Sequence, residues 1–344
     1  MKLLWDFPKK VLSLTFLCLN FVGCAKTETA TPETKHVVVV TDAFFDDFLA
    51  ISYLLESPYI LVDALVVSGI GFCYLDAGAK NLANYLAYVK MPHIPISSLS
   101  NTGMCNEGSV PKAWLLDEQN LFGIHLKNSP KGPRQISGSD LIAEKVLRAN
   151  SKVTLLCITA LNNVAEFLLN YPYLHGKIEK IVIMGGAIYV PGNINTKFNG
   201  YLNDTAEYNI ALDPCSAEVV FNADIPKVLC PLDVTDTLPL NRDIINEYRS
   251  YLTSDVGEFV NVLMHNVIKL NEDAKLMFWD AVAAAYLVDP SMFTTRKLNL
   301  VVNTTQGPDF GKTSINYDGS EIEVCTGINQ DLFYKSFFHS MKSK

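Results

Sequence analysis

The chain has 344 residues, 49% of them hydrophobic, which is enough apolar material for a large core and argues against a disordered or small disulfide-stapled protein. Its formal net charge is −8 and its pI is about 5.3. The sequence contains no run of Lys and Arg interleaved with aromatic residues. Its composition therefore argues against nucleic acid as a partner.

Residues 1–23 are predicted to be a signal peptide that directs export. Three lysines precede an apolar stretch from Val11 to Gly23, which is too short to span a bilayer as a stable anchor. The stretch ends at Phe21-Val22-Gly23-Cys24, which resembles the bacterial lipobox, where the cysteine is lipidated and becomes the new N-terminus. The alternative is an ordinary signal peptide with an incidental cysteine, since Phe21 is an unusual residue at its place.

Residues 24–35 are rich in Thr, Glu and Pro and are predicted to form a flexible tether. The tether and a lipidated Cys24 predict that residues 36–344 form an exported domain. Lipid on this cysteine would hold the domain to a membrane of the bacterial cell envelope, where it faces the periplasm or the cell surface.

The cysteines after Cys24 lie far apart and show no CxxC spacing. Several fall within apolar runs, where a buried free thiol is usual. Export permits disulfides but this spacing does not require any, so we predict none. The cysteines concerned are Cys73, Cys105, Cys157, Cys215, Cys230 and Cys325.

From His36 onward, short apolar runs rich in β-branched residues alternate with longer amphipathic segments, a pattern typical of a parallel α/β sheet. The predicted strands cover residues 36–41, 60–67, 94–97, 153–159, 178–184, 227–232 and 298–303. The predicted helices cover residues 46–56, 77–88, 141–149 and 164–170, a segment opened by Asp213-Pro214, most of 243–287, and a C-terminal segment that follows a hairpin. No linker or change of composition divides this pattern. We therefore predict a single large α/β domain, Rossmann-like, with a mostly parallel central sheet flanked by helices.

Three carboxylates follow the first predicted strand, at the end of the sheet where ligands of such folds bind. Asp42 comes directly after the strand, and Asp46 and Asp47 open the next helix. This concentration of negative charge would be relieved by a cation, and hard oxygen ligands suit calcium or magnesium. Alternatively, Asp46 and Asp47 are first-turn acids that favour the helix dipole, and Asp42 only ends a strand. These three residues alone do not separate the two interpretations.

Further polar elements follow the later predicted strands in a fixed order. They are Leu161-Asn162-Asn163, Met184-Gly185-Gly186, Gly192-Asn193, Ala206-Glu207-Tyr208-Asn209, Asp213-Pro214 and, opening a late helix, Trp279-Asp280. Together with the aspartates after the first strand, this series resembles the inosine-uridine preferring nucleoside hydrolase family over almost the whole predicted domain. A lone D-x-x-x-D-D motif would not be specific, whereas this ordered series is.

The resemblance implies the nucleoside hydrolase fold and calcium-dependent hydrolysis of the N-glycosidic bond of ribonucleosides. Such a reaction passes through an oxocarbenium-like ribose and needs a water that a metal ion and a carboxylate make nucleophilic. The resemblance assigns Asp42 as the catalytic base and a Ca²⁺ ligand. Asp47, Asp280 and the backbone carbonyl of Asn162 would complete the protein's share of the metal site.

The same resemblance implies that Asp46 holds a ribose hydroxyl, while Asn193, Glu207 and Asn209 bind the sugar from its other edges. Ribose is small, so contacts to each hydroxyl supply the orientation at the anomeric carbon. Each amide also has a simpler interpretation, as a turn residue or a helix-start polar group. We interpret Asp213 as a helix cap, and family members suggest a homo-oligomer.

The sequence departs from the family motif around the first strand. Val40 stands where the motif has its first acid, and Ala43-Phe44 replaces a Pro-Gly pair. The segment after the second strand lacks the family's asparagine and offers only Ser68 near its place. These departures keep open a second hypothesis, a lipoprotein that binds a nucleoside or another ribosyl ligand with weak or no turnover.

Trp279 occupies the place where many family members carry a histidine that protonates the leaving base. An indole does not titrate usefully, but it can stack on a base. Purine-preferring members carry a tryptophan here, so Trp279 favours purine nucleosides as the predicted substrates. Trp114 could provide a second stacking face or could equally be a core residue or part of a lid.

Overall fold

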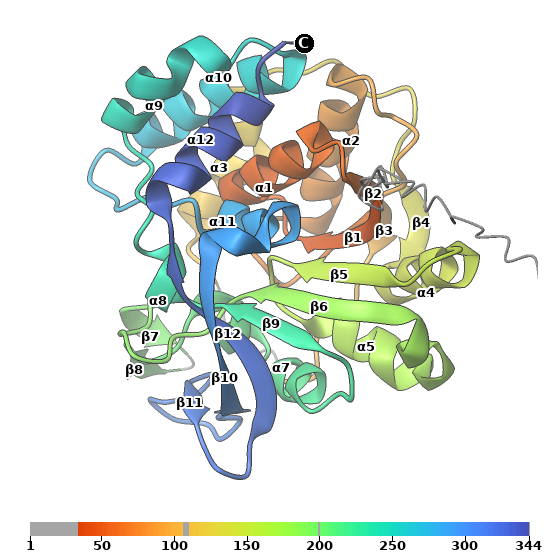
Figure 1. The fold of residues 1–344 in the computed structure, drawn as a ribbon, viewed down its shortest axis with the longest axis vertical. Helices are drawn as coiled ribbons and strands as arrows, with labels where there is room; N and C mark the ends of the chain where they lie inside the picture. The colour runs from red at the N-terminus through yellow and green to blue at the C-terminus, as the bar shows by residue number, and fades with distance from the viewer. Residues whose placement is uncertain (1–33, 106–109, 199, 344) are drawn as a thin grey trace, which may run out of the picture. The chain divides into compact units, whose positions relative to one another are not determined.

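The computed structural model describes residues 34–105, 110–198 and 200–343 (Figure 1). The predicted signal peptide, the lipidation site at Cys24 and most of the predicted tether lie outside the described residues. In the described part of the chain, no helix combines the length and apolar character needed to cross a membrane.

The centre of the domain is an eight-stranded sheet with the strand order β11-β10-β12-β9-β6-β5-β1-β2. Five neighbouring pairs, from β2 to β12, are parallel, and only β10 runs antiparallel to its neighbours β11 and β12. This confirms the predicted α/β domain with a mostly parallel central sheet. The strands of this sheet are β1 (Lys35–Thr41), β2 (Ile60–Val67), β5 (Val153–Cys157), β6 (Ile178–Met184), β9 (Lys227–Cys230), β10 (Phe293–Val302), β11 (Thr313–Ile315) and β12 (Ser320–Ile328).

Two small sheets lie beside the central one. The strands β3 (Ser97–Leu99) and β4 (Arg134–Ser137) form a parallel pair, and β7 (Thr196–Phe198) and β8 (Tyr201–Asn203) form a hairpin.

Helices cover both faces of the central sheet (Figure 1). The α-helices are α1 (Phe45–Glu56), α2 (Leu75–Tyr88), α3 (Lys112–Gln119), α4 (Gly138–Arg148), α5 (Asn162–Asn170), α6 (Tyr208–Leu212), α7 (Pro214–Phe221), α8 (Leu232–Thr235), α9 (Arg242–Tyr248), α10 (Asp255–Leu270), α11 (Trp279–Val288) and α12 (Gln330–Ser340). Short 3₁₀ turns cover Leu121–Gly123, Pro172–Lys177, Arg249–Tyr251 and Pro290–Met292.

The alternation of side chains along β1 divides the interior into two cores. Val37 and Val39 join the cluster formed with α1, α10, α11 and α12, while Val38 and Val40 join the cluster formed with α4, α5 and α7. A strand buried on both faces has no polar face, which is why its sequence reads as a continuous apolar run. Val40 is therefore a core residue and not a member of the acidic site.

Four predicted strands differ from the structure by more than one residue at an end. The strand predicted at 298–303 is the longer β10 (Phe293–Val302), and nearby residues explain the other three. The short strand expected at 94–97 begins only at Ser97, and before it Ile96 makes just an isolated bridge to β2. The strand β9 ends at Cys230 because Pro231 follows and a short helix begins at Leu232. The strand β5 ends at Cys157, and the next residues turn towards Asp42.

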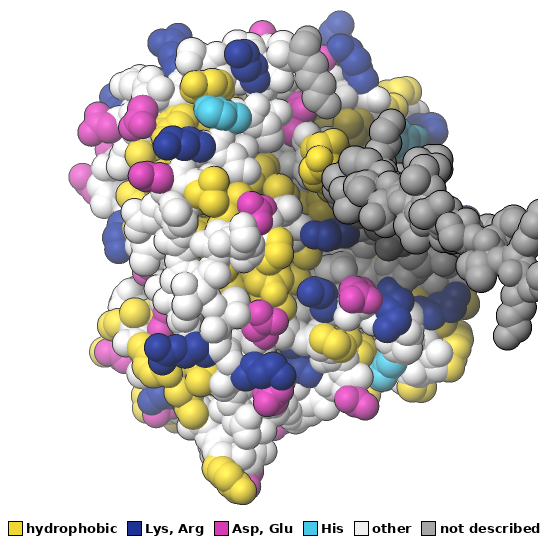
Figure 2. Space-filling view, viewed as in Figure 1, with side chains coloured by type: hydrophobic (Ala, Val, Ile, Leu, Met, Phe, Trp, Pro, Cys, Tyr) yellow, Lys and Arg dark blue, Asp and Glu magenta, His cyan; other side chains and the backbone are white. Residues whose placement is uncertain are grey.

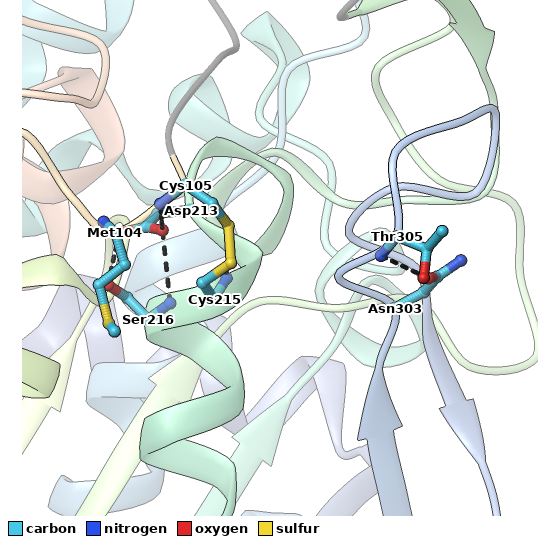
Figure 3. Close-up of a disulfide and its surroundings, with 7 residues drawn as sticks. All are labelled: Met104, Cys105, Asp213, Cys215, Ser216, Asn303 and Thr305. Carbon is cyan, nitrogen blue, oxygen red and sulfur yellow. Dashed lines mark hydrogen bonds between the residues drawn. A yellow bond between two sulfur atoms is a disulfide. The ribbon is translucent and has the colours of Figure 1, made fainter.

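The prediction of no disulfide is wrong, because Cys105 and Cys215 are bonded (Figure 3). The two cysteines are 110 residues apart in sequence, and only the fold brings their Cα atoms to 5.6 Å. Spacing along the chain therefore could not reveal the pair. The remaining cysteines of the described domain, Cys73, Cys157, Cys230 and Cys325, are buried free thiols.

Asp213 caps α7 beside this disulfide, as the sequence predicted. Its carboxylate accepts the backbone N–H groups of Ser216 at 3.3 Å, Met104 at 2.9 Å and Cys105 at 3.0 Å (Figure 3). The aspartate and the disulfide together fix the loop after β3 to the start of α7.

On the face shown in Figure 2, Lys and Arg side chains lie among Asp and Glu side chains.

Candidate functional site

The turn from β1 into α1 is built around the carboxylate of Asp47. The backbone N–H groups of Asp42 and Phe44 each donate to it at 3.1 Å, and the hydroxyl of Thr41 donates as well. Ala43 adopts a left-handed backbone conformation with φ of 60°, which the turn requires and which costs a residue with a Cβ about 1–2 kcal/mol. The turn thus sets the aspartates at the carboxyl end of the first strand, as predicted.

Four buried carboxylates converge on one cavity. Oxygens of Asp46, Asp47 and Asp280 lie within 4.8 Å of one another, and Asp42 lines the same cavity. No ion pair found among the described residues includes any of these acids. The negative charge is therefore uncompensated by the chain itself.

Burial raises the pKa of all four carboxyls above the ordinary value, and raises that of Asp46 to about 8. Repulsion from neighbouring carboxylates adds to the effect for Asp46, Asp47 and Asp280. Clustered carboxylate oxygens without a counter-charge are the donor set that Ca²⁺ and Mg²⁺ prefer. The residues present therefore fit a divalent metal ion. Asp46, which was predicted to hold a ribose hydroxyl, lies within the same 4.8 Å as the predicted ligands Asp47 and Asp280.

Asp42 is held by groups that the sequence did not reveal. Its Oδ2 accepts the backbone N–H of Phe72 at 2.8 Å and the hydroxyl of Thr159 at 2.9 Å. The segment after β2 passes so close that a Cβ on Gly71 would lie 1.9 Å from this oxygen. A backbone N–H thus contacts the acid in the region where the sequence lacks the family's asparagine.

Asn162 does not join the acidic cluster. Its side chain accepts a hydrogen bond from Ser68 at 2.9 Å and donates to Asn101 at 2.7 Å, and its backbone carbonyl accepts from the Asn101 amide at 3.3 Å. The residue of this β5–α5 connection that lines the cavity is Ile158. The predicted role of the Asn162 carbonyl as a metal ligand therefore stays a prediction.

Glu207 lines the same cavity as the aspartates. It caps the N-terminus of α6 by accepting the N–H groups of Asn209 at 2.9 Å and Ile210 at 3.2 Å, and it also accepts that of Gly186 at 3.0 Å. Burial raises its pKa to about 7, although these three hydrogen bonds favour the charged form. The Met-Gly-Gly strand end and the Ala-Glu-Tyr-Asn segment are therefore one structural unit.

Both predicted sugar-binding asparagines line the cavity beside Glu207. The amide of Asn209 donates to the backbone carbonyl of Met184 at 3.2 Å, and the amide oxygen of Asn193 accepts the N–H of Tyr208 at 3.0 Å. Each side chain is thereby oriented by the backbone and keeps further hydrogen-bonding capacity. The structure brings Asp46, Asn193, Glu207 and Asn209 to one cavity, as the sequence predicted.

Aromatic side chains form the remaining wall of the cavity, which encloses about 450 Å³. Phe72 and Trp114 are stacked, with ring centroids 5.6 Å apart, and Phe44 packs beside Phe72 at 5.1 Å. Trp279 also lines the cavity, and its indole N–H donates to Asp236 at 2.8 Å. Both tryptophans singled out in the sequence therefore present surfaces to the same space.

Other residues that line the cavity carry no motif and were missed by the sequence reasoning. They are Asn195, Asp236, Asn271 and Lys275, together with the backbone neighbours of the last one, Ala274 and Leu276. These residues come from connecting segments, whose place in the fold no short pattern predicts.

An acidic cavity therefore lies at the carboxyl ends of a mostly parallel sheet, with amide and aromatic side chains in its lining. The chain matches the family model "Inosine-uridine preferring nucleoside hydrolase" over residues 37–335 and belongs to that family. It is accordingly a hydrolase that acts on N-glycosyl compounds.

The comparisons with individual proteins agree with this family. The chain is 28% identical over 286 residues to the pyrimidine-specific ribonucleoside hydrolase RihA of Salmonella schwarzengrund, covering 82% of this chain and 88% of that protein. The fold is similar to that of the purine-preferring ribonucleoside hydrolase of Gardnerella vaginalis, with a TM-score of 0.77, 24% identity and coverage of 89% and 98% of the two chains. It is also similar to the inosine-uridine preferring nucleoside hydrolase of Bacillus anthracis, with a TM-score of 0.76, 22% identity and coverage of 90% and 99%.

The contact between Gly71 and Asp42 predicts the effect of one added methyl group. Gly71→Ala should displace Asp42 and lower kcat/KM for ribose release by about 100-fold, because small misplacements of a catalytic group have costs of that order. Gly69→Ala is the matched control, since its Cβ would meet no atom closer than 3.6 Å. Equal activities of the two folded variants would contradict the prediction.

A second prediction concerns Glu118, a fully buried residue of α3, the helix that carries Trp114. Its Oε1 accepts from the Asn81 amide at 3.2 Å, and burial raises its pKa from 4.5 to about 8. Because the pKa is raised only in the folded state, this carboxyl ionises more easily in the unfolded chain. The free energy of unfolding therefore falls as pH rises from 4.5 to 8.

Glu118→Gln should therefore increase the free energy of unfolding at about pH 9 by on the order of 2 kcal/mol, and the gain should vanish near pH 4. Urea denaturation at a series of pH values measures this difference. Glu179→Gln, at an exposed position of β6, controls for the substitution itself. A gain that does not change with pH would argue against a buried ionisation at Glu118.

Proposed function

We propose that this protein hydrolyses ribonucleosides to ribose and free base with the help of Ca²⁺, with a preference for purine bases. The observation that carries the proposal is the gathering of acidic and amide side chains in one cavity. Asp42, Asp46, Asp47 and Asp280, the acidic wall, line this cavity together with Glu207, Asn193 and Asn209. The acidic wall fits a divalent metal ion, and the polar groups of the lining can bind the hydroxyls of a ribose.

The acidic wall would hold the ion through Asp42, Asp47 and Asp280, with Asp46 at the boundary between metal and sugar. A bound Ca²⁺ would supply the positive charge that lowers the pKa of a water near the anomeric carbon. The backbone carbonyl of Asn162, the ligand that the family resemblance implies, accepts from the Asn101 amide at 3.3 Å and keeps a second lone pair. The choice of calcium rests on the family resemblance and on the all-oxygen donor set.

The chain's own residues account for the remaining steps. Asp42 accepts a proton from the attacking water, because its carboxylate lies in the cavity and is oriented by Thr159 and the Phe72 N–H. The water oxygen forms a bond to C1′ while the C1′–N bond breaks and its electron pair leaves with the base. Glu207, Asn193 and Asn209 orient the sugar during this exchange.

The base preference rests on Trp279 and Trp114, whose ring faces suit a large flat base. The relatives differ on this point, since RihA is named as pyrimidine-specific and the Gardnerella enzyme as purine-preferring. The stacked wall of Phe72 and Trp114 supports the purine assignment for this chain.

A second candidate function is nucleoside binding without turnover. Phe44, which replaces a glycine of the family motif, lines the cavity and packs against Phe72. This departure from the family motif is the observation that supports a binder. The retained Asp42, Asp47 and Asp280 favour the enzyme.

An assay of ribose release separates these functions. The purified soluble domain should release ribose from inosine and guanosine faster than from uridine, and a chelator should abolish release. Asp42→Ala should lower the rate by at least about 1,000-fold without loss of the fold, because the water loses its proton acceptor. Nucleoside binding by calorimetry without any ribose release would support the binder.

We further propose that the domain is exported and anchored by lipid on Cys24. The Cys105–Cys215 disulfide supports export, because such bonds persist in oxidising compartments outside the cytosol. The acyl chains would supply the attachment to the membrane.

Replacement of the lipidation site tests this anchor. Cys24→Ser should move the protein from the membrane fraction to the soluble fraction of fractionated cells, as measured by immunoblot. Cys73→Ala, a change at a buried thiol of the folded domain, should leave the distribution unchanged. Retention of the Cys24→Ser protein in membranes would show that the anchor lies elsewhere.

A further inference from the structure

The proposed reaction leaves negative charge on the departing base. As the C1′–N bond breaks, its electron pair moves onto the ring system, and a donor that meets this charge lowers the barrier. The aspartates of the acidic wall cannot stabilise this charge, because the proposed mechanism assigns them to the water and the sugar. A group on the base side has to supply a proton or positive charge.

The obvious donors on the base side are already engaged. The single N–H of Trp279 donates to Asp236 at 2.8 Å, so the indole offers the base only its ring face. The hydroxyl of Tyr208 forms a side-chain hydrogen bond with Thr196. Among the described residues that line the cavity there is no histidine.

Lys275 is the one cation among these lining residues. It lies in the connection between α10 and α11, four positions before Trp279, and its neighbours Ala274 and Leu276 also line the cavity. It takes part in none of the ion pairs or side-chain hydrogen bonds found in the described parts of the chain. Its exposed ammonium is therefore available to a ligand and to solvent.

We propose that Lys275 is the catalytic proton donor to the departing base, an inference that rests on the proposed nucleoside hydrolysis. The C1′–N electron pair moves to the base, and a ring nitrogen or carbonyl oxygen of the base takes a proton from the ammonium. Lys275 becomes a neutral amine and regains a proton from water, which its exposed position allows. Trp279, fixed by Asp236, stacks on the base and holds it in reach of the lysine.

Two substrates with different leaving groups test this role. Inosine needs a proton donor for its base, whereas p-nitrophenyl β-D-ribofuranoside releases a phenolate that is stable without one. Lys275→Met should lower kcat for inosine on the order of 100-fold, with little change in KM, and should leave kcat for the nitrophenyl riboside within about twofold of the wild type. Lys269→Met, at an exposed lysine of α10 outside the cavity lining, is the matched control and should change neither.

The outcomes separate this inference from the function on which it rests. A wild-type protein that releases ribose from neither substrate overturns the proposed function and the role of Lys275 with it. An active wild type whose Lys275→Met variant keeps full activity on inosine overturns the inference alone. Equal losses on both substrates would also overturn it, because a leaving-group donor cannot affect them alike. A rise in KM alone would assign the lysine to substrate binding instead.

Discussion

The repulsion among four buried carboxylates is the constraint on which this structure depends. Asp42, Asp46, Asp47 and Asp280 line one cavity, and no ion pair among the described residues includes them, so the fold must hold them against their charge. Burial of both faces of the central sheet supplies that rigidity. Local hydrogen bonds to Asp47 then set the turn. The clustered carboxylates create a negative electrostatic potential that attracts a metal ion.

Much of the fold and half of the site could be predicted from the sequence, because the signals are local. Continuous apolar runs identify strands that are covered on both faces, and β2 and β6 match their predicted bounds. The acids after β1 and the Glu207-Tyr208-Asn209 segment could be identified because each forms a short motif at a strand or helix end. Their side chains are oriented by backbone groups nearby in sequence, so the motif carries most of the geometry.

The rest of the site is formed by segments that are distant in sequence. They contribute backbone groups, or side chains that belong to no recognisable motif. Every residue but proline has an N–H, so nothing in the sequence shows that Phe72 donates to Asp42 across 30 positions. A backbone ligand such as the one predicted at Asn162 is hard to identify for the same reason, since carbonyls carry no side-chain signature. The disulfide and Lys275 are likewise defined by which loops meet, a property of the assembled fold.

The hydrogen bond between Trp279 and Asp236 has a consequence for selectivity. An indole whose only donor is occupied reads a base by the area and fit of its ring, not by the pattern of polar atoms on its edge. Shape-based discrimination of this kind reaches about 10–200-fold, whereas a matched polar site can exceed 10,000-fold. Trp279 would therefore add to the discrimination between bases by their size, and would add nothing to discrimination by their polar edges.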